Sequence, residues 1–324
     1  MANGKFIISL DFELMWGVME NKNKTTYGEN ILGVHTAIPR LLDLFDKYGI
    51  KATFSTVGFL FFENKQELLN NLPAVLPEYE NKKLSPYNNY LDTLGNDDKD
   101  DPYHFGYKLL QLIQQRKEHE IGTHTFCHYY CLEKGQTIDA FREDIQHAVA
   151  VAKKKNIEIT SLVFPRNQFN DGYLKVCADA GIICYRGNEH SWIYKAMSRE
   201  SESLLRRALR LADAYINISG HNCYTTESLK NKYPVDIPSS RFLRPYSKKL
   251  KFLDALRLKR ITSAMTHAAK ENMLYHIWWH PHNFGINQDE NFAFLEKILQ
   301  HFKILHERHN FESLTMTDFA KRIN

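Results

Sequence analysis

Short apolar segments alternate with longer segments of helical periodicity along most of this 324-residue chain. The apolar segments, which we expect to be strands, cover residues 5–11, 51–57, 119–123, 159–164, 182–185, 215–219 and 273–279. Between and after them lie patterns of ten or more residues at helical spacing, such as residues 31–47, 137–155 and 289–309. This alternation is typical of βαβ units, in which helices connect parallel strands. The sequence therefore predicts an α/β fold with a parallel sheet.

Seven candidate strands without an internal repeat or an evident linker favour one barrel-like domain over two domains. We therefore expect residues 1–324 to form a single domain with insertions. One insertion covers about residues 72–103, where Pro, Asn, Asp and Lys predict a long irregular loop. A basic segment at about 241–260 carries eight Lys and Arg residues against Asp254. It indicates either an anion-binding or membrane-facing surface or simply a solvated helix face.

Composition and charge exclude several classes of protein. The chain has 42 Lys and Arg against 38 Asp and Glu, and a net charge of +4 is too small to indicate a nucleic-acid partner. No apolar stretch is long enough for a transmembrane helix, and the apolar run at residues 6–10 is too short for a signal peptide. Five cysteines without a C-x-x-C pair are typical of free thiols in a reducing compartment. We therefore expect a cytoplasmic chain.

Polar side chains follow several of the predicted strands, at the point where each strand ends. Asp11 and Glu13 come after F-I-I-S-L, His124 and His128 after E-I-G-T, Arg166 after S-L-V-F-P, and His280 and His282 after Y-H-I-W-W. The active sites of β/α barrels lie at the C-terminal ends of the strands. We therefore expect these side chains to meet at one rim of the barrel.

Asp11 and Glu13 are two residues apart, so both carboxylates point to one face of an extended chain. One could bind a metal ion while the other acts as a base, and the simpler interpretation is a solvated strand end. Their setting, F-E-L-M-W-G, favours a site because unpaired carboxylates are costly among apolar groups. His124 and His128 are four residues apart, a spacing that lets two imidazoles reach one ion. Two ordinary core or surface histidines are the alternative.

Other residues are candidates for binding or protonating a substrate. By strand alternation Trp278 and His280 share a face, and His280 at the strand end is placed to donate a proton. The forked donors of Arg166 could clamp a carboxylate, or Arg166 could be a surface residue. Polar groups and a ring follow the strand at residues 186–192, as a sugar site requires. The candidates for substrate binding are Arg186, Trp192, Trp278 and His282.

Taken in order, S-L-D-F-E, G-T-H-T-F-C-H, F-P-R-N-Q and W-W-H-P-H resemble the motifs of the polysaccharide deacetylases. This family is also called the NodB-homology family or carbohydrate esterase family 4. The resemblance covers about residues 5–285 and is to the branch whose first two acids stand two residues apart. It implies a distorted (β/α)7-type barrel. It also implies these roles: Asp11 as base, Glu13, His124 and His128 as metal ligands, His280 as acid, and Arg166 as the partner that orients the base.

The implied activity is metal-dependent removal of an acetyl group from an N-acetylated sugar, in the assembly of a surface polysaccharide such as O-antigen or capsule. The implied cofactor is a divalent metal, zinc first, with Co²⁺, Ni²⁺ or Mn²⁺ as alternatives. The sugar could be nucleotide- or lipid-linked, with peripheral contact to a membrane. Two other hypotheses are a metal-dependent hydrolase of small amides, like allantoinase, and a catalytically silent sugar-binding protein on the same fold.

Overall fold

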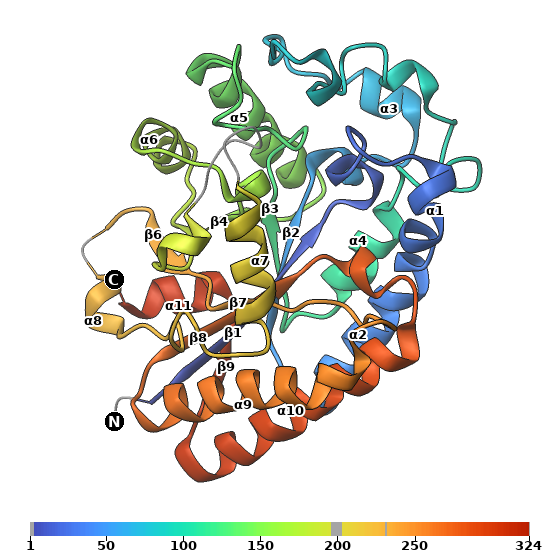
Figure 1. Ribbon diagram of the computed structural model, residues 1–324. Helices are drawn as coiled ribbons and strands as arrows, with labels where there is room; N and C mark the ends of the chain where they lie inside the picture. The colour runs from blue at the N-terminus through green and yellow to red at the C-terminus, as the bar shows by residue number, and fades with distance from the viewer. Residues whose placement is uncertain (1–2, 196–202, 231, 324) are drawn as a thin grey trace.

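The computed structural model describes residues 3–195, 203–230 and 232–323 of the chain. A curled sheet of parallel strands occupies its centre, and helices surround the sheet (Figure 1). The strands are β1 (Lys5–Phe12), β2 (Ala52–Thr56), β3 (Glu120–Thr123), β4 (Ser161–Leu162), β5 (Cys184–Gly187), β6 (Val235–Pro238), β7 (Arg241–Phe242), β8 (Leu274–Trp279) and β9 (Glu312–Leu314). The helices are α1 (Lys24–Leu32), α2 (Val34–Tyr48), α3 (Lys65–Leu69), α4 (Tyr107–Gln115), α5 (Ile138–Lys154), α6 (Asp171–Asp179), α7 (Leu204–Asp213), α8 (Thr226–Leu229), α9 (Asp254–Lys270), α10 (Gln288–His309) and α11 (Met316–Ile323).

The strand order is β6-β5-β4-β3-β2-β1-β8-β7, with β9 added to β1. One stretch of chain joins the two ends of this order, because β6 pairs with β5 and β7 pairs with β8. Between β6 and β7, the amide of Ser239 donates to the carbonyl of Gly187 at 2.9 Å, and the amide of Ser240 donates to the carbonyl of His276 at 2.7 Å. Residues 235–242 therefore close the sheet into the distorted (β/α)7-type barrel that the sequence predicts.

Apolar side chains hold the helices against the outside of the barrel. On β1, Phe6, Ile8, Leu10 and Phe12 are fully buried in the main core. The helix α2 buries residues at positions 34, 37, 38, 41, 42 and 45, the spacing of one helical face. Burial of apolar surface on this scale is the main favourable term in folding. The alternate residues of β1, among them Ser9 and Asp11, are thereby left for the barrel interior.

Most predicted elements are present, with shifted ends. The helix predicted at 31–47 is two helices, α1 and α2. The strand predicted at 215–219 is wrong. Asp213 at the end of α7 accepts hydrogen bonds from the backbone amides of Ile218 and Ser219, at 2.9 and 2.8 Å. These amides are thereby tied into a turn and do not join the sheet, whose corresponding strand is the segment 235–242.

The two unusual segments differ in how far they match expectation. The insertion at 72–103 is irregular, with short 3-10 turns at Lys82–Leu84 and Leu91–Thr93. Buried Asp101 orders it by accepting from the Gly95 amide at 3.0 Å and by pairing with Lys24 at 2.9 Å. The basic segment is not a solvated helix face, since three of its arginines are buried: Arg241, Arg257 and Arg260. No helix in the described ranges is both long enough and apolar enough to cross a bilayer.

Candidate active site

The predicted site residues meet at the C-terminal rim of the barrel. Asp11 lies near the end of β1 and Glu13 follows it, while His124 comes directly after β3. The parallel register places Asp11 beside Ser55 of β2, and β2 in turn pairs with β3. The strand β8 delivers Trp278 and then His280 to the same rim. The side chains thus converge because parallel strands end at one edge, as the sequence predicts.

Glu13, His124 and His128 form a compact cluster. Glu13 Oε2 lies 3.2 Å from His124 Nε2 and 3.2 Å from His128 Nε2. One ligand atom from each residue lies within 4.8 Å of the other two, and all three side chains are buried. Burial alone would raise the pKa of Glu13, but His280, His124 and His128 together hold it well below its ordinary value. The carboxylate is therefore ionised.

Hydrogen bonds on the far side of each imidazole settle which nitrogen faces Glu13. His124 Nδ1 lies 2.8 Å from the carbonyl of Val163, an acceptor, so it carries the proton. His128 Nδ1 lies 3.0 Å from the Tyr130 hydroxyl, which itself donates to Glu20 and must accept from the histidine. Burial lowers the pKa of His128 and keeps the ring neutral.

In each ring Nε2 is therefore the nitrogen that faces the Glu13 carboxylate. An unprotonated Nε2 on each ring would offer its lone pair, beside the carboxylate, to a cation. Two neutral imidazoles and one carboxylate are a common donor set of catalytic zinc sites. The residues present fit a divalent metal. Metal dependence is general in the family that these motifs resemble.

Backbone strain is concentrated around this cluster. Among the described residues eleven non-glycine residues have a positive φ, and seven of them are asparagines, which tolerate it. The other four are Leu14, Thr125, His128 and Arg166, with φ between 48° and 64°. Leu14 and Thr125 directly follow the candidate ligands Glu13 and His124, and His128 is itself a candidate ligand. Such conformations cost about 1–3 kcal/mol each and cluster at functional sites.

Two residues that the sequence analysis missed support the ligands. Asp144 of α5 accepts hydrogen bonds from the amides of Phe126, at 2.7 Å, and Cys127, at 3.0 Å, and so fixes the loop between the two histidines. Gly17 gives Glu13 its space, because a Cβ on Gly17 would lie 1.9 Å from Glu13 Cδ. The sequence does contain a signal for Asp144, because it is a carboxylate on the otherwise apolar, buried face of α5.

Asp11 is held by Arg186 and not by Arg166, which corrects the sequence analysis. Arg186 Nη1 and Nη2 donate to Asp11 Oδ1 and Oδ2 at 2.7 and 2.8 Å, a bidentate pair that is almost fully buried. Arg186 also donates to Ser9 Oγ at 3.1 Å and Asn167 Oδ1 at 3.0 Å. Burial opposes ionisation of Asp11, but Arg186, with His124 and His280, lowers its pKa below the ordinary value.

Arg166 lies elsewhere on the rim. Its guanidinium pairs with Glu20 and, at 2.8 Å, with Glu133, and it stacks over the Tyr130 ring at 4.1 Å. Because Tyr130 contacts His128, Arg166 supports the second histidine ligand and not the base. The predicted substrate residue Trp192 is 63% exposed and does not line the cavity described below.

The ring of His280 completes the site. Its Nε2 lies 3.6 Å from Asp11 Oδ2 and 3.7 Å from Glu13 Oε1, and its Nδ1 lies 3.3 Å from Asn283 Oδ1. An amide oxygen can only accept, so Nδ1 carries a proton and Nε2 faces the carboxylates. His282 stacks on His280 with 4.8 Å between ring centroids and is buried, with Nδ1 3.7 Å from Glu13 Oε1.

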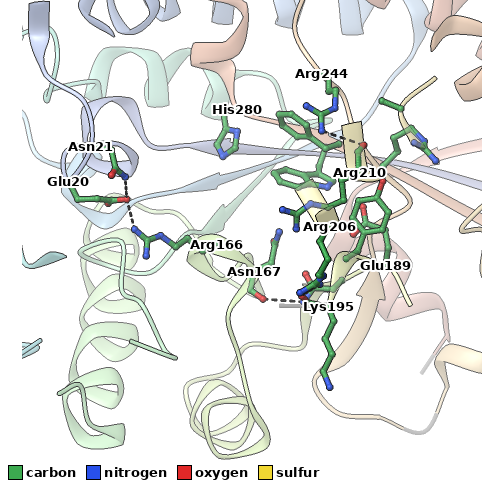
Figure 2. A pocket seen from close by; sticks show the side chains of 16 residues that line it. Glu20, Asn21, Arg166, Asn167, Glu189, Lys195, Arg206, Arg210, Arg244 and His280 are labelled. Carbon is green, nitrogen blue, oxygen red and sulfur yellow. Dashed lines mark hydrogen bonds and ion pairs between the residues drawn. The ribbon is translucent and has the colours of Figure 1, made fainter. Parts of the chain in front are cut away.

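A cavity of about 450 Å³ opens beside His280 (Figure 2). Trp278 and Phe242 form an aromatic wall, with 4.8 Å between their ring centroids. Arg186, expected to bind substrate, instead stacks behind this wall at 4.0 Å from the Trp278 ring centroid. In Figure 2, Glu20 and Arg166 lie on one side of His280 and Arg206, Arg210 and Arg244 on the other.

A parallel β/α barrel with a carboxylate–histidine cluster, a buried aspartate and a histidine at its C-terminal rim has the architecture of a hydrolase active site. Comparison with known proteins shows which family the chain resembles. The sequence model of the polysaccharide deacetylases matches residues 26–185, which include His124 and His128. Over this part the chain is similar to that family, also called the NodB-homology family or carbohydrate esterase family 4.

Solved structures show the same fold. A Mycobacterium smegmatis protein assigned as a polysaccharide deacetylase is similar with a TM-score of 0.62 and 12% identity, over 100% of this chain and 91% of that one. The 4-α-glucanotransferase of Thermococcus litoralis is similar with a TM-score of 0.54 and 11% identity, over 99% of this chain and 40% of that one. This chain thus spans less than half of the glucanotransferase. No curated protein matches the chain.

Proposed function

We propose that the chain is a metal-dependent de-N-acetylase that hydrolyses the acetamide of an N-acetylated sugar. One observation carries the proposal. His280, which lines a cavity, lies 3.7 Å from Glu13 of the Glu13, His124 and His128 cluster and 3.6 Å from Asp11, the buried aspartate that Arg186 holds. These are the parts that metal-assisted amide hydrolysis requires.

The chemistry divides among the residues as follows. A divalent cation bound by Glu13, His124 and His128 would polarise the acetamide carbonyl and lower the pKa of a water molecule. Asp11 Oδ2, kept ionised by Arg186, takes a proton from the attacking water. His280 Nε2 gives a proton to the departing sugar nitrogen as the C–N bond breaks. The products are acetate and a free amino sugar.

The metal and the sugar are further parts of the proposal. Two imidazoles and a carboxylate suit Zn²⁺ first, and Co²⁺, Ni²⁺ or Mn²⁺ as alternatives. The aromatic wall of Trp278 and Phe242 supports a sugar ring as the occupant of the cavity. His282, stacked beneath His280, orients the acid. The catalytically silent sugar-binding protein stays the alternative, and it expects a metal site without a competent base.

The proposal extends to the setting of the reaction. We infer that the enzyme acts in the cytoplasm, where its substrate is a sugar destined for a surface polysaccharide such as O-antigen or capsule. The support for a reducing compartment is that all five cysteines are free thiols, four of them buried. The support for surface-polysaccharide assembly is the family resemblance of the motifs.

Acetate release tests the function. Protein loaded with Zn²⁺ or Co²⁺ is incubated with a panel of N-acetylated monosaccharides, nucleotide sugars and oligosaccharides, with and without a chelator. We expect metal-dependent acetate release from at least one compound, reduced about 10²–10⁴-fold in Asp11→Asn and unchanged in the control Asp289→Asn, whose side chain is 92% exposed. Metal binding without acetate release would favour the silent protein, and activity only on small non-sugar amides would favour the allantoinase-like hydrolase.

A further inference from the structure

The cavity beside His280 is strongly cationic. Six of the side chains that line it are cationic, namely Arg166, Lys195, Arg206, Arg210, Arg241 and Arg244, against two carboxylates, Glu20 and Glu189. A neutral sugar chain needs no such charge. Four of the arginines are carried by α7 and by the segment that follows β6, and three of them, Arg206, Arg210 and Arg244, lie on the same side of His280 in Figure 2.

Two carboxylates line the cavity together with this arginine cluster of residues 206, 210, 241 and 244, and are fewer than its guanidinium groups. Glu20 is engaged on the opposite side of the cavity, where it binds Arg166 and the Tyr130 hydroxyl. Glu189 is buried, and burial raises its pKa although the charge of Arg241 acts in the opposite direction. Behind the cavity wall lies one further carboxylate, Asp213, which has to serve two guanidinium groups, Arg241 at 3.3 Å and Arg260 at 3.5 Å.

Arg241 has two buried nitrogen donors, Nε and Nη2, that are not used within the described part of the chain. Its side chain is only 4% exposed, and Nη1 donates to the Asp213 carbonyl at 3.0 Å and to its carboxylate. Nε and Nη2 are buried and have no hydrogen-bond partner among the described residues. Buried donors without acceptors are rare because they lose water without replacement. Since Arg241 lines the cavity, an acceptor on a bound ligand is the group that would satisfy them.

Arg244 lines the same cavity. Its Nη2 donates weakly to the carbonyl of Arg210, at 3.4 Å. Burial lowers the pKa of Arg244, and the neighbouring charges of Arg210 and Arg241 push it in the same direction. An anion between these guanidinium groups would relieve their mutual repulsion.

We propose that this arginine cluster binds a phosphate group of the substrate, so that the enzyme acts on an N-acetylated sugar linked to a phosphate or diphosphate. The inference rests on the proposed function, because Trp278 and His280 line the same cavity and the anion must belong to the molecule whose acetamide reaches His280. Several forked guanidinium donors around one cavity match the many oxygens of a phosphate better than the two of a single carboxylate. Nucleotide-linked and lipid-linked sugars share this chemistry.

Anion binding to metal-free protein tests the site separately from catalysis. The probe is inorganic pyrophosphate, titrated calorimetrically into chelator-treated protein so that it cannot bind a metal. We expect Arg244→Gln to weaken binding about tenfold or more, since each charged hydrogen bond is worth at least that factor. Arg241→Gln should do the same if it folds. Lys249→Gln, an exposed cation of the same segment outside the cavity, is the matched control and should bind as the wild type does.

Two outcomes would overturn the site: absence of pyrophosphate binding, or equal weakening in Lys249→Gln and Arg244→Gln. Tighter binding of glucuronate than of pyrophosphate would also overturn it in favour of a carboxylate. Acetate release then compares N-acetylglucosamine, its 1-phosphate, its nucleotide diphosphate and its prenyl diphosphate, and the last two distinguish the sources. If pyrophosphate binding depends on Arg244 while no acetate is released, the proposed function fails and the anion site stands. If acetate is released without preference for phosphate-linked sugars, the proposed function stands and the phosphate site fails.

Discussion

Replacing Arg186 by methionine would leave the Asp11 carboxylate buried without its partner. The wild-type pair has two short hydrogen bonds, at 2.7 and 2.8 Å, and both residues are at most 2% exposed. Breaking a buried pair by removing one partner costs about 3–5 kcal/mol, because the remaining charge stays desolvated. We therefore expect Arg186→Met to lose about that much of the free energy of unfolding, a large share of the 5–15 kcal/mol of a typical protein.

The double variant Arg186→Met, Asp11→Asn removes both charges and should recover part of this loss. We expect the two changes to be coupled by about 2–3 kcal/mol, measured by urea unfolding with the slope compared between variants. Arg186→Lys retains the charge but not the fork, so it should lose about 1.5–3 kcal/mol and serves where Arg186→Met does not fold. If the single losses simply add in the double variant, Arg186 does not balance Asp11 and its role as the positioning residue of the base is refuted.

Three further variants test the supports of the site. Gly17→Ala should weaken metal binding about 10–100-fold by displacing the Glu13 carboxylate, measured by titration of metal-free protein; unchanged affinity would show that Glu13 is not a ligand. Asp144→Asn should cost about 1–3 kcal/mol in urea unfolding, and a loss below 0.5 kcal/mol would show that it does not hold the loop between the histidines. Asp213→Asn should lose about 2 kcal/mol at pH 7 and progressively less below pH 4; a loss independent of pH would contradict this.

The sign of the last prediction follows from the surroundings of Asp213. Burial alone would raise its pKa, but Arg241 and hydrogen bonds from Ser219 and Tyr194 lower it from 3.8 to about 2. A depressed pKa means that the folded state binds the proton less tightly than the unfolded chain does. The stabilisation is therefore complete above about pH 4 and is lost as the pH falls through about 2.

The sequence predicted the residues that stand at strand ends, because a parallel barrel brings those ends together whatever the details of packing. It could not distinguish Arg186 from Arg166, since each lies within or just after a short strand. In the structure Pro165 and the left-handed backbone of Arg166 turn that side chain toward Glu20 and Glu133, whereas Arg186 lies within β5 and reaches Asp11 inside the barrel. Local sequence does not encode that difference of direction.

The strand that closes the barrel was also beyond the sequence pattern. Residues 235–242 are short of apolar residues, begin next to Pro234 and contain Pro238, features that argue against a strand. They form β6 and β7 because the edges of β5 and β8 offer unpaired backbone groups on either side. The arginine cluster follows from this closure. Arg241 belongs to the basic segment of the sequence, and because it lies in β7 it becomes part of the barrel wall.

X-ray absorption of the Zn²⁺-loaded protein is the measurement that tests the central claim most directly. The claim is that Glu13, His124 and His128 together hold one divalent metal at the rim of the barrel. We predict one zinc per chain, with a spectrum fitted by two imidazole nitrogens at about 2.0–2.1 Å and carboxylate or water oxygens at about 2.0–2.2 Å, and one imidazole fewer in His128→Ala. A sulfur ligand, or a spectrum that His128→Ala leaves unchanged, would contradict the account.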